Sequence, residues 1–270
     1  EMTSSLVGSE MCIRDSIYPM THISEILEWC NREGQTFWEY VEECEGPGIW
    51  DYLDEIWTAM CETIVRGLTA EGVLPGGLKV SRKASTYLVK AESYTDTLRS
   101  RAKLYAYALA TAEENASGGT VVTAPTCGSS AVMPAVLYHL VNTRNFSRLR
   151  ILRALATGGL FGNVAKTNSS ISGAEVGCQG EVGVACAMAA AAACQLFGGT
   201  PSQIEYAAEM GLEHHLGLTC DPVCGLVQIP CIERNAVAAA RALDANSYAN
   251  LSDGHHMISY DLSLIHISEP

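Results

Sequence analysis

Basic residues are scarce in this chain of 270 residues. Lysine and arginine together number 17, against 30 aspartates and glutamates, which gives a formal net charge of −13 and a pI near 4.9. A nucleic-acid-binding surface needs concentrated positive charge to meet the phosphate backbone. The charge balance therefore predicts that the chain has no nucleic-acid partner.

A long uninterrupted apolar run is also lacking. A membrane-spanning helix needs about 20 consecutive apolar residues, and the nearest stretch, GVACAMAAAAACQLFGG at 183–199, is mostly alanine. Such small side chains suit a close-packed core helix better than one that faces lipid. EMTSSLVGSEMCIRDS at the start carries acids and has no apolar central run, so it does not read as a secretory signal. We expect a cytoplasmic chain with no membrane partner.

The two ends of the sequence differ in character from the rest. SLVGSEMCIRDS (5–16) and SLIHISEP (263–270) resemble translated sequencing-adapter sequence. We therefore expect residues 1–16 and 262–270 to be foreign to the native chain, as tags and fusion scars are. The segment between them, residues 17–261, is predicted to form one domain.

No alternating strand pattern exceeds four or five residues, and no internal repeat is evident. Apolar positions recur instead at spacings of three and four, as in amphipathic helices. This periodicity predicts helices within 21–70, over about 94–116, from 148 to the glycine pair at 158–159, over 201–217 and over 235–251. We expect a mainly α fold: a single multi-helix domain whose Gly-, Ser- and Pro-rich loops converge on one site.

A Gly/Ser/Thr-rich segment, ASGGTVVTAPTCGSSA at 116–131, separates two of these helices. Its first glycines are expected to end one helix and CGSSA to open the next. Free backbone N–H groups at a helix start favour an anion such as a carboxylate. Thr126 and Ser129 are therefore candidate substrate-binding residues. An ordinary connection between helices explains the same pattern and stays an alternative.

Cysteine, in contrast, is abundant, with 11 residues. In a reducing compartment, clustered cysteines indicate metal binding or catalysis rather than disulfides. Five of them fall at helical intervals among apolar residues, where burial is the simpler explanation: Cys30, Cys44, Cys61, Cys186 and Cys194. Three have different surroundings: Cys178 in GAEVGCQGEVG, Cys220 in GLTCDPVCG and Cys231 in VQIPCIERN.

The loops around these three cysteines suit a metal site. Glycines on both sides of Cys178 would let the backbone approach a bulky inorganic group. The separations, 42 residues from Cys178 to Cys220 and 11 more to Cys231, match neither the paired-cysteine zinc pattern nor the tight run of bacterial ferredoxins. From spacing alone, a metal site and unremarkable cysteines both stay open.

Three longer segments carry a resemblance to a known family. VVTAPTCGSSAVMPAVLYHL, GAEVGCQGEVGVACAMAAA and LEHHLGLTCDPVCGLVQIPCIERNA resemble signature segments of the iron–sulfur-dependent L-serine dehydratases, in particular of their α, or cluster-binding, domain. In that family three cysteines hold a [4Fe–4S] cluster and leave one iron without a protein thiolate. The resemblance places these ligands at Cys178, Cys220 and Cys231. The family's motif tolerates other residues at Cys224, so we interpret Cys224 as a bystander thiol, whereas Cys127 is expected to line the site without binding the metal.

The resemblance implies deamination of L-serine to pyruvate and ammonia without pyridoxal phosphate. Removing water from serine is difficult, because hydroxide is a poor leaving group and the adjacent Cα–H is only weakly acidic. An iron with an open coordination position can act as a Lewis acid on the serine hydroxyl. The family also has a β domain or β chain with a Ser-Ser-His-Thr motif, which this sequence lacks. We therefore expect a β partner, a homo- or hetero-oligomer, and little or no activity from this chain alone.

A polar run just before Cys178 supplies further candidates. Lys166, Asn168, Ser170 and Ser172 offer donors for a carboxylate. We expect the first three to be catalytic and Ser172 to bind substrate.

Two histidines and three acids adjoin the same motifs. His214 is expected to be catalytic, by orienting the substrate or the metal ligands, while His215 faces the core. Glu175, Glu181 and Asp221 are candidates for a base, although ordering the loops is the simpler role for acids there.

Two other functions are compatible with the sequence. One is a related elimination on cysteine or threonine, which pocket size would decide. The other is a structural or electron-transfer metal module, which predicts a fully cysteine-ligated cluster or a zinc ion. A separate α chain and a fragment of a single-chain enzyme both fit the sequence equally well.

Overall fold

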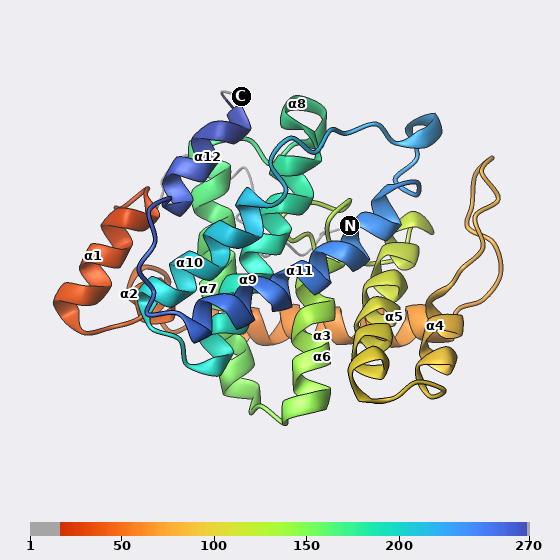
Figure 1. The fold of residues 1–270 in the computed structure, drawn as a ribbon, viewed down its shortest axis with the longest axis horizontal. Coiled ribbons are helices and arrows are strands. Elements are labelled where there is room, and N and C mark those ends of the chain that lie inside the picture. The colour runs from red at the N-terminus through yellow and green to blue at the C-terminus, as the bar shows by residue number, and fades with distance from the viewer. Residues whose placement is uncertain (1–16, 269–270) are drawn as a thin grey trace.

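The computed structural model describes residues 17–268, which fold into α-helices joined by loops (Figure 1). Within this range no β-strand forms, and an isolated antiparallel bridge joins Val73 and Ser81. The predicted mainly α class is confirmed. In chain order the α-helices are α1 (Ile23–Glu33), α2 (Phe37–Glu45), α3 (Ile49–Thr69), α4 (Ala84–Ala91), α5 (Asp96–Ala116), α6 (Val132–Arg144), α7 (Arg148–Asn168), α8 (Gly173–Cys178), α9 (Val184–Phe197), α10 (Pro201–Glu213), α11 (Cys231–Leu251) and α12 (Tyr260–Ser268).

Helix α9 forms the centre of the core and is surrounded by α6, α7, α10 and α11 (Figure 1). Its alanines, together with Cys186 and Cys194, are buried on every side, as the small side chains predict. The stretch Gly173–Phe197 is long and apolar enough to cross a membrane, but 83% of its most apolar window is buried inside the fold. That burial is the pattern of a core helix.

Helix α7 differs from its prediction, because it does not end at the glycine pair of residues 158–159 but continues to Asn168. A Cβ added at Gly158 would lie 2.2 Å from Met133 Cε and 2.8 Å from the Met188 carbonyl oxygen. The glycine thus allows α7 to pack closely against α6 and α9, and burial in this contact outweighs its low helix propensity.

The start of α6 also differs from its prediction. CGSSA does not open the helix, which begins at Val132, and residues 128–131 form turns. The Ser130 hydroxyl donates to the Cys127 carbonyl over 2.7 Å, and the Thr126 N–H donates to the Ser129 hydroxyl over 3.4 Å. Such local side-chain bonds compete with helix formation. Helix α4, which the periodicity did not reveal, is eight residues long.

The C-terminal segment packs on the rest of the fold. Leu264 and Ile267 of α12 are buried, and the Tyr260 hydroxyl donates to the Phe161 carbonyl over 3.1 Å. That residues 262–270 are foreign stays a prediction. Residues 1–16, for which the same prediction was made, lie outside the described residues, as do 269–270.

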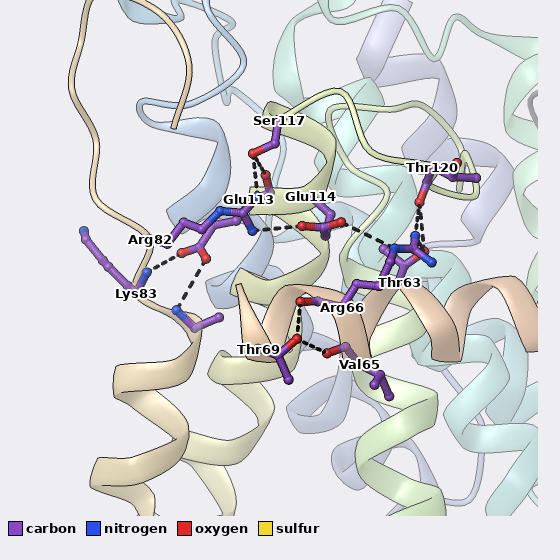
Figure 2. Close-up of polar contacts among 11 residues, drawn as sticks. Thr63, Val65, Arg66, Thr69, Arg82, Lys83, Glu113, Glu114, Ser117 and Thr120 are labelled. Carbon is purple, nitrogen blue, oxygen red and sulfur yellow. Dashed lines mark hydrogen bonds and ion pairs between the residues drawn. The ribbon is translucent and has the colours of Figure 1, made fainter. Parts of the chain in front are cut away.

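Two buried carboxylates at the end of α5 hold the segment before α4 (Figure 2). Glu113 accepts a hydrogen bond from the Lys83 backbone N–H over 2.6 Å, and Glu114 accepts one from the Arg82 guanidinium over 2.9 Å. Burial raises the pKa of the Glu113 carboxyl, against the opposing effect of these donors.

The same network reaches the loop that follows α5 (Figure 2). Arg82 donates to the Ser117 hydroxyl over 2.7 Å. Arg66 of α3 lies 3.5 Å from the Glu114 carboxylate and donates to the Thr120 carbonyl over 2.8 Å. The loop of residues 117–131, of which 126–128 line the site described next, is therefore fixed at its start by charged hydrogen bonds.

Candidate metal and substrate site

Two of the three predicted cysteine ligands lie together with an acid. One ligand atom each from Cys178, Glu181 and Cys220 lies within 4.8 Å of the other two. Cys178 ends α8, Glu181 follows in a π-helical turn at Gln179–Gly183, and Cys220 belongs to the loop between α10 and α11. Cys178 is buried, whereas Cys220 is exposed.

Hydrogen bonds hold the Cys178 segment against the Cys220 loop. Gly177 has a φ of 78°, a left-handed conformation that glycine adopts more easily than other residues. A Cβ at this position would lie 2.7 Å from the Leu218 carbonyl oxygen. The Gln179 N–H donates to that same carbonyl over 3.0 Å. The Gln179 side chain in turn accepts from the Gly217 N–H over 2.9 Å. Gly177, the residue before Cys178, thus permits the close approach of this backbone to that of Leu218.

Cys231 is the first residue of α11 and is 8% exposed. Burial raises the pKa of its thiol, and the nearby Glu181 and Cys220 raise it further. The third predicted ligand therefore lies near the same acid and cysteine, although its sulfur is outside the 4.8 Å group. The ligand roles of the three cysteines stay predictions.

Arg234 links the three cysteine segments. Its guanidinium donates to Cys178 Sγ over 3.1 Å and to the Thr219 carbonyl over 2.7 Å, and it pairs with Asp221 at 3.4 Å. Burial raises the pKa of the Cys178 thiol to about 12, while the hydrogen bond from Arg234 acts in the opposite direction. This arginine is the cation that would favour a thiolate at Cys178.

Glu181 is held between two loops. The Thr126 hydroxyl donates a short hydrogen bond to its carboxylate. A Cβ at Gly128 would lie 2.4 Å from one carboxylate oxygen, and a Cβ at Gly173 would lie 2.6 Å from the other. Both glycines are therefore needed for the carboxylate to reach its place beside the thiols.

Asn235 joins the Thr126 loop to α11. Its buried amide donates to the Gly128 carbonyl over 2.7 Å and to the Cys231 carbonyl over 2.9 Å, and its oxygen accepts from the Ala131 N–H over 3.1 Å. The amide is thus fully used in fixing this loop against the helix that begins at Cys231.

A cavity of about 590 Å³ opens on Glu181. Of the residues predicted to be catalytic or substrate-binding, it brings together Thr126, Lys166, Ser170 and Ser172. Ser129 is buried behind the wall, with its hydroxyl 3.0 Å from that of Thr126. The other lining residues are Cys127, Gly128, Ser169, Ile171, Gly173 and Glu175.

Two predicted catalytic residues do not line this cavity. The Asn168 amide donates to the Thr21 carbonyl over 2.7 Å. His214 lines a separate cavity with Arg241, and its Nδ1 lies 2.9 Å from the Met210 carbonyl oxygen. Their catalytic roles stay predictions. His215 is buried, as expected, with its Nδ1 2.7 Å from the Gly211 carbonyl oxygen.

Sequence reasoning missed Arg234 and Asn235 and gave Glu181 only a minor role. A signal existed, because Glu181 follows Cys178 by three residues and Arg234 follows Cys231 by three. That spacing places two side chains on one helical face. Cys224, predicted to be a bystander, is exposed. Cys127, expected to line the site without binding the metal, is also exposed and lines the cavity beside Glu181.

The fold and the site together define an all-α domain in which cysteines and a carboxylate meet beside a polar cavity. Comparison with known proteins identifies it further: the chain belongs to the family of the serine dehydratase alpha chain, which matches residues 22–265. The resemblance inferred from the three motifs is confirmed.

The chain is similar to curated L-serine dehydratases. It is 45% identical to that of Streptomyces coelicolor over 265 residues, which cover 94% of this chain and 58% of the relative. It is 46% identical to L-serine dehydratase 1 of Escherichia coli strain K12 over 238 residues, covering 84% and 52%. The chain thus spans about half the length of the curated relatives it matches.

Proposed function

We propose that this chain is the cluster-binding α portion of an L-serine dehydratase, which deaminates L-serine to pyruvate and ammonia. The observation that carries the proposal is the meeting of Cys178, Cys220 and Glu181, with Cys231 nearby, in a member of this family. L-serine is the substrate named by the relatives.

The residues present fit an iron–sulfur cluster. Thiolates are the donors that such clusters require, and Cys178, Cys220 and Cys231 would hold it. A Cβ at Gly173 would lie 3.2 Å from Cys220 Sγ, so the glycine keeps the space in front of this sulfur open. When bound, the cluster would supply Lewis-acid activation of the serine hydroxyl through an iron without a protein thiolate.

The cavity walls suit a zwitterionic amino acid. Lys166 supplies positive charge for the substrate carboxylate, and the Ser172 side chain supplies a hydroxyl donor. Thr126, whose hydroxyl donates to Glu181, holds that carboxylate in the cavity wall. Glu175 and Glu181 on the same walls supply negative charge for the substrate ammonium group. Opposite charges across one cavity would orient the amino acid, which is the positioning that an elimination requires.

The proposal includes a β domain or β chain of the same enzyme, an oligomeric assembly and a cytoplasmic location. The chain's share of its relatives' length supports the β partner, because 42% or more of each cited relative lies outside the match. We expect this chain without that partner to have little or no turnover.

Anaerobic reconstitution with iron and sulfide tests the proposal. Absorption and electron paramagnetic resonance spectra are recorded with L-serine and, as the matched control, with D-serine. We expect a cluster spectrum that L-serine changes and D-serine does not. A colourless zinc protein, or a cluster indifferent to L-serine, would contradict the proposal.

A further inference from the structure

We propose that the cavity between the segment after α10 and the first half of α11 binds a small aliphatic carboxylate, held by Arg241. The inference goes beyond the proposed function and does not rest on it, because this cavity shares no lining residue with the cavity that opens on Glu181. It also gives the pair His214 and His215, which line this cavity, a place in a second binding site.

The cavity has the size and the apolar walls of a small-molecule site. Its volume is about 430 Å³, within the range of about 300–1,000 Å³ that ligand pockets occupy. The apolar part of its wall is made by Val182, Leu216, Leu218, Pro230 and Val237. An aliphatic chain placed here would cover these side chains and lose its own contact with water, which favours binding.

Arg241 supplies a positive charge at the edge of this cavity. It is exposed, and within the part of the chain that the structure describes its guanidinium makes no hydrogen bond and no ion pair. Asp244, almost one turn further along α11, pairs instead with Arg101 at 3.2 Å. The planar fork of an arginine fits a carboxylate with two parallel hydrogen bonds. An unpaired arginine beside apolar walls therefore suits a carboxylate with an aliphatic chain.

Acidic residues around the cavity already have other cationic partners. Glu233, the acid of the cavity wall, lies 3.3 Å from the Lys83 ammonium. Asp221 pairs at 3.4 Å with Arg234, the other arginine of the wall, whose guanidinium also holds the cysteine segments described above. The charge left for a ligand is therefore that of Arg241.

The two histidines show that this charge reaches the inner wall. His214 Nδ1 lies 2.9 Å from the Met210 carbonyl oxygen, and His215 Nδ1 lies 2.7 Å from that of Gly211. A carbonyl oxygen only accepts, so Nδ1 carries the proton in both rings and Nε2 is left for a ligand or water. Burial lowers the pKa of His215, and the charge of Arg241 lowers it further, against the hydrogen bond to Gly211.

Saturation-transfer NMR with butyrate and the unchanged chain tests the inference. We expect saturable binding of butyrate and none of butan-1-ol, which has the apolar chain without the charge. Arg241→Gln should weaken butyrate binding at least about tenfold, and Arg241→Lys, which keeps the charge but not the fork, should weaken it less. The matched control is Lys166→Gln, which removes a cation from the other cavity and should leave butyrate binding unchanged.

Val237→Asp gives a second test at a position that is 52% exposed, where the change leaves the core intact. An acid one turn before Arg241 would pair with it and repel the ligand, so we expect a loss of affinity as large as in Arg241→Gln. Circular dichroism establishes that each variant is folded.

Four results would overturn the inference: no saturable butyrate binding, equal affinity in folded Arg241→Gln, loss of binding in Lys166→Gln, or equal binding of butan-1-ol. Displacement of butyrate by an equal concentration of inorganic phosphate would overturn the assignment of the ligand as a carboxylate. Failure of the unchanged chain to assemble a cluster, with butyrate binding intact, would contradict the proposed function alone.

Discussion

The Arg234 guanidinium donates a hydrogen bond to Cys178 Sγ over 3.1 Å, across 56 positions of sequence. Arg234 follows Cys231 by one helical turn and also binds the Thr219 carbonyl, next to Cys220. One side chain therefore touches all three cysteine segments. Replacing Arg234 should therefore loosen the arrangement of the three segments while leaving all three thiols in place.

Arg234→Gln should assemble a cluster that loses iron to a chelator at least about tenfold faster, as loss of an outer partner weakens metal sites. Release of iron is followed by the colour of the chelator complex. Arg241→Gln on the same helix is the control, because Arg241 lines the cavity of His214, as Arg234 also does, but follows Arg234 by seven residues along α11 and so lies farther from Cys231. Equal release rates for both variants would refute the role assigned to Arg234.

The buried pair of Arg82 and Glu114 should contribute strongly to stability. Their side chains are 10% and 11% exposed, so Arg82→Met leaves the buried acid with Arg66, a more exposed partner 3.5 Å away, as its remaining cation. We expect a loss of about 2–4 kcal/mol in the free energy of unfolding, measured by urea denaturation.

The control for this pair is Lys103→Met, which breaks an ion pair with Glu92 whose side chains are 32% and 62% exposed. Exposed pairs contribute about 1 kcal/mol or less. Similar losses for Arg82→Met and Lys103→Met would show that burial of the first pair has no special effect.

Gly67 lets α3 lie against α5. A Cβ there would be 2.2 Å from the Ala110 carbonyl oxygen, which is backbone and cannot turn aside. Gly67→Ala should therefore cost about 1–3 kcal/mol through overpacking, despite the better helix propensity of alanine. Thermal unfolding of Gly67→Ala is compared with Gly48→Ala, since a Cβ at Gly48 has no neighbour within 4 Å. Equal melting temperatures would contradict the packing argument.

The stability of the fold should fall between about pH 4.5 and pH 7 because of Glu209. Burial, with nearby Glu213 and Glu205, raises the pKa of this carboxyl to about 7, against the hydrogen bond from Ser263 and the charge of His256. A raised pKa in the folded state means that the folded chain holds its proton more tightly. Its contribution to stability, about 3 kcal/mol, is complete below the unfolded pKa and is lost as the pH rises through 7.

Glu209→Gln should flatten this part of the pH dependence, while Glu55→Gln at an exposed position should leave it unchanged. The measurement is urea denaturation at several pH values. His256 contributes in the same direction, because its bond with Glu205 raises its pKa. An unchanged slope in Glu209→Gln would show that another group titrates.

The sequence predicted much of the fold because helical periodicity is a local property. The prediction failed where a distant neighbour decides the outcome. Gly158 would end many helices, but here Met133 and Met188 require a small residue at that position. Helix α4 was missed because eight residues give too few turns for a periodic signal.

The candidate site was likewise predicted where the signal is local and missed where it depends on distant residues. The loop context of Cys178, Cys220 and Cys231 is readable along the chain, and it distinguished them from the cysteines at helical intervals, although Cys178 and Cys231 are themselves buried. The positions of Glu181 and Arg234 depend on partners 55 and 56 residues away, Thr126 and Cys178. No local pattern encodes such contacts, although a spacing of three from a cysteine pointed toward both residues.

Iron and sulfide content after anaerobic reconstitution tests the central claim most directly. The unchanged chain and Cys224→Ser should each bind about four irons, whereas Cys178→Ser, Cys220→Ser and Cys231→Ser should bind few. Cys224 is the matched control, since it lies in the same loop as Cys220 and is also exposed. A full complement of iron in Cys231→Ser, or its loss in Cys224→Ser, would contradict the account.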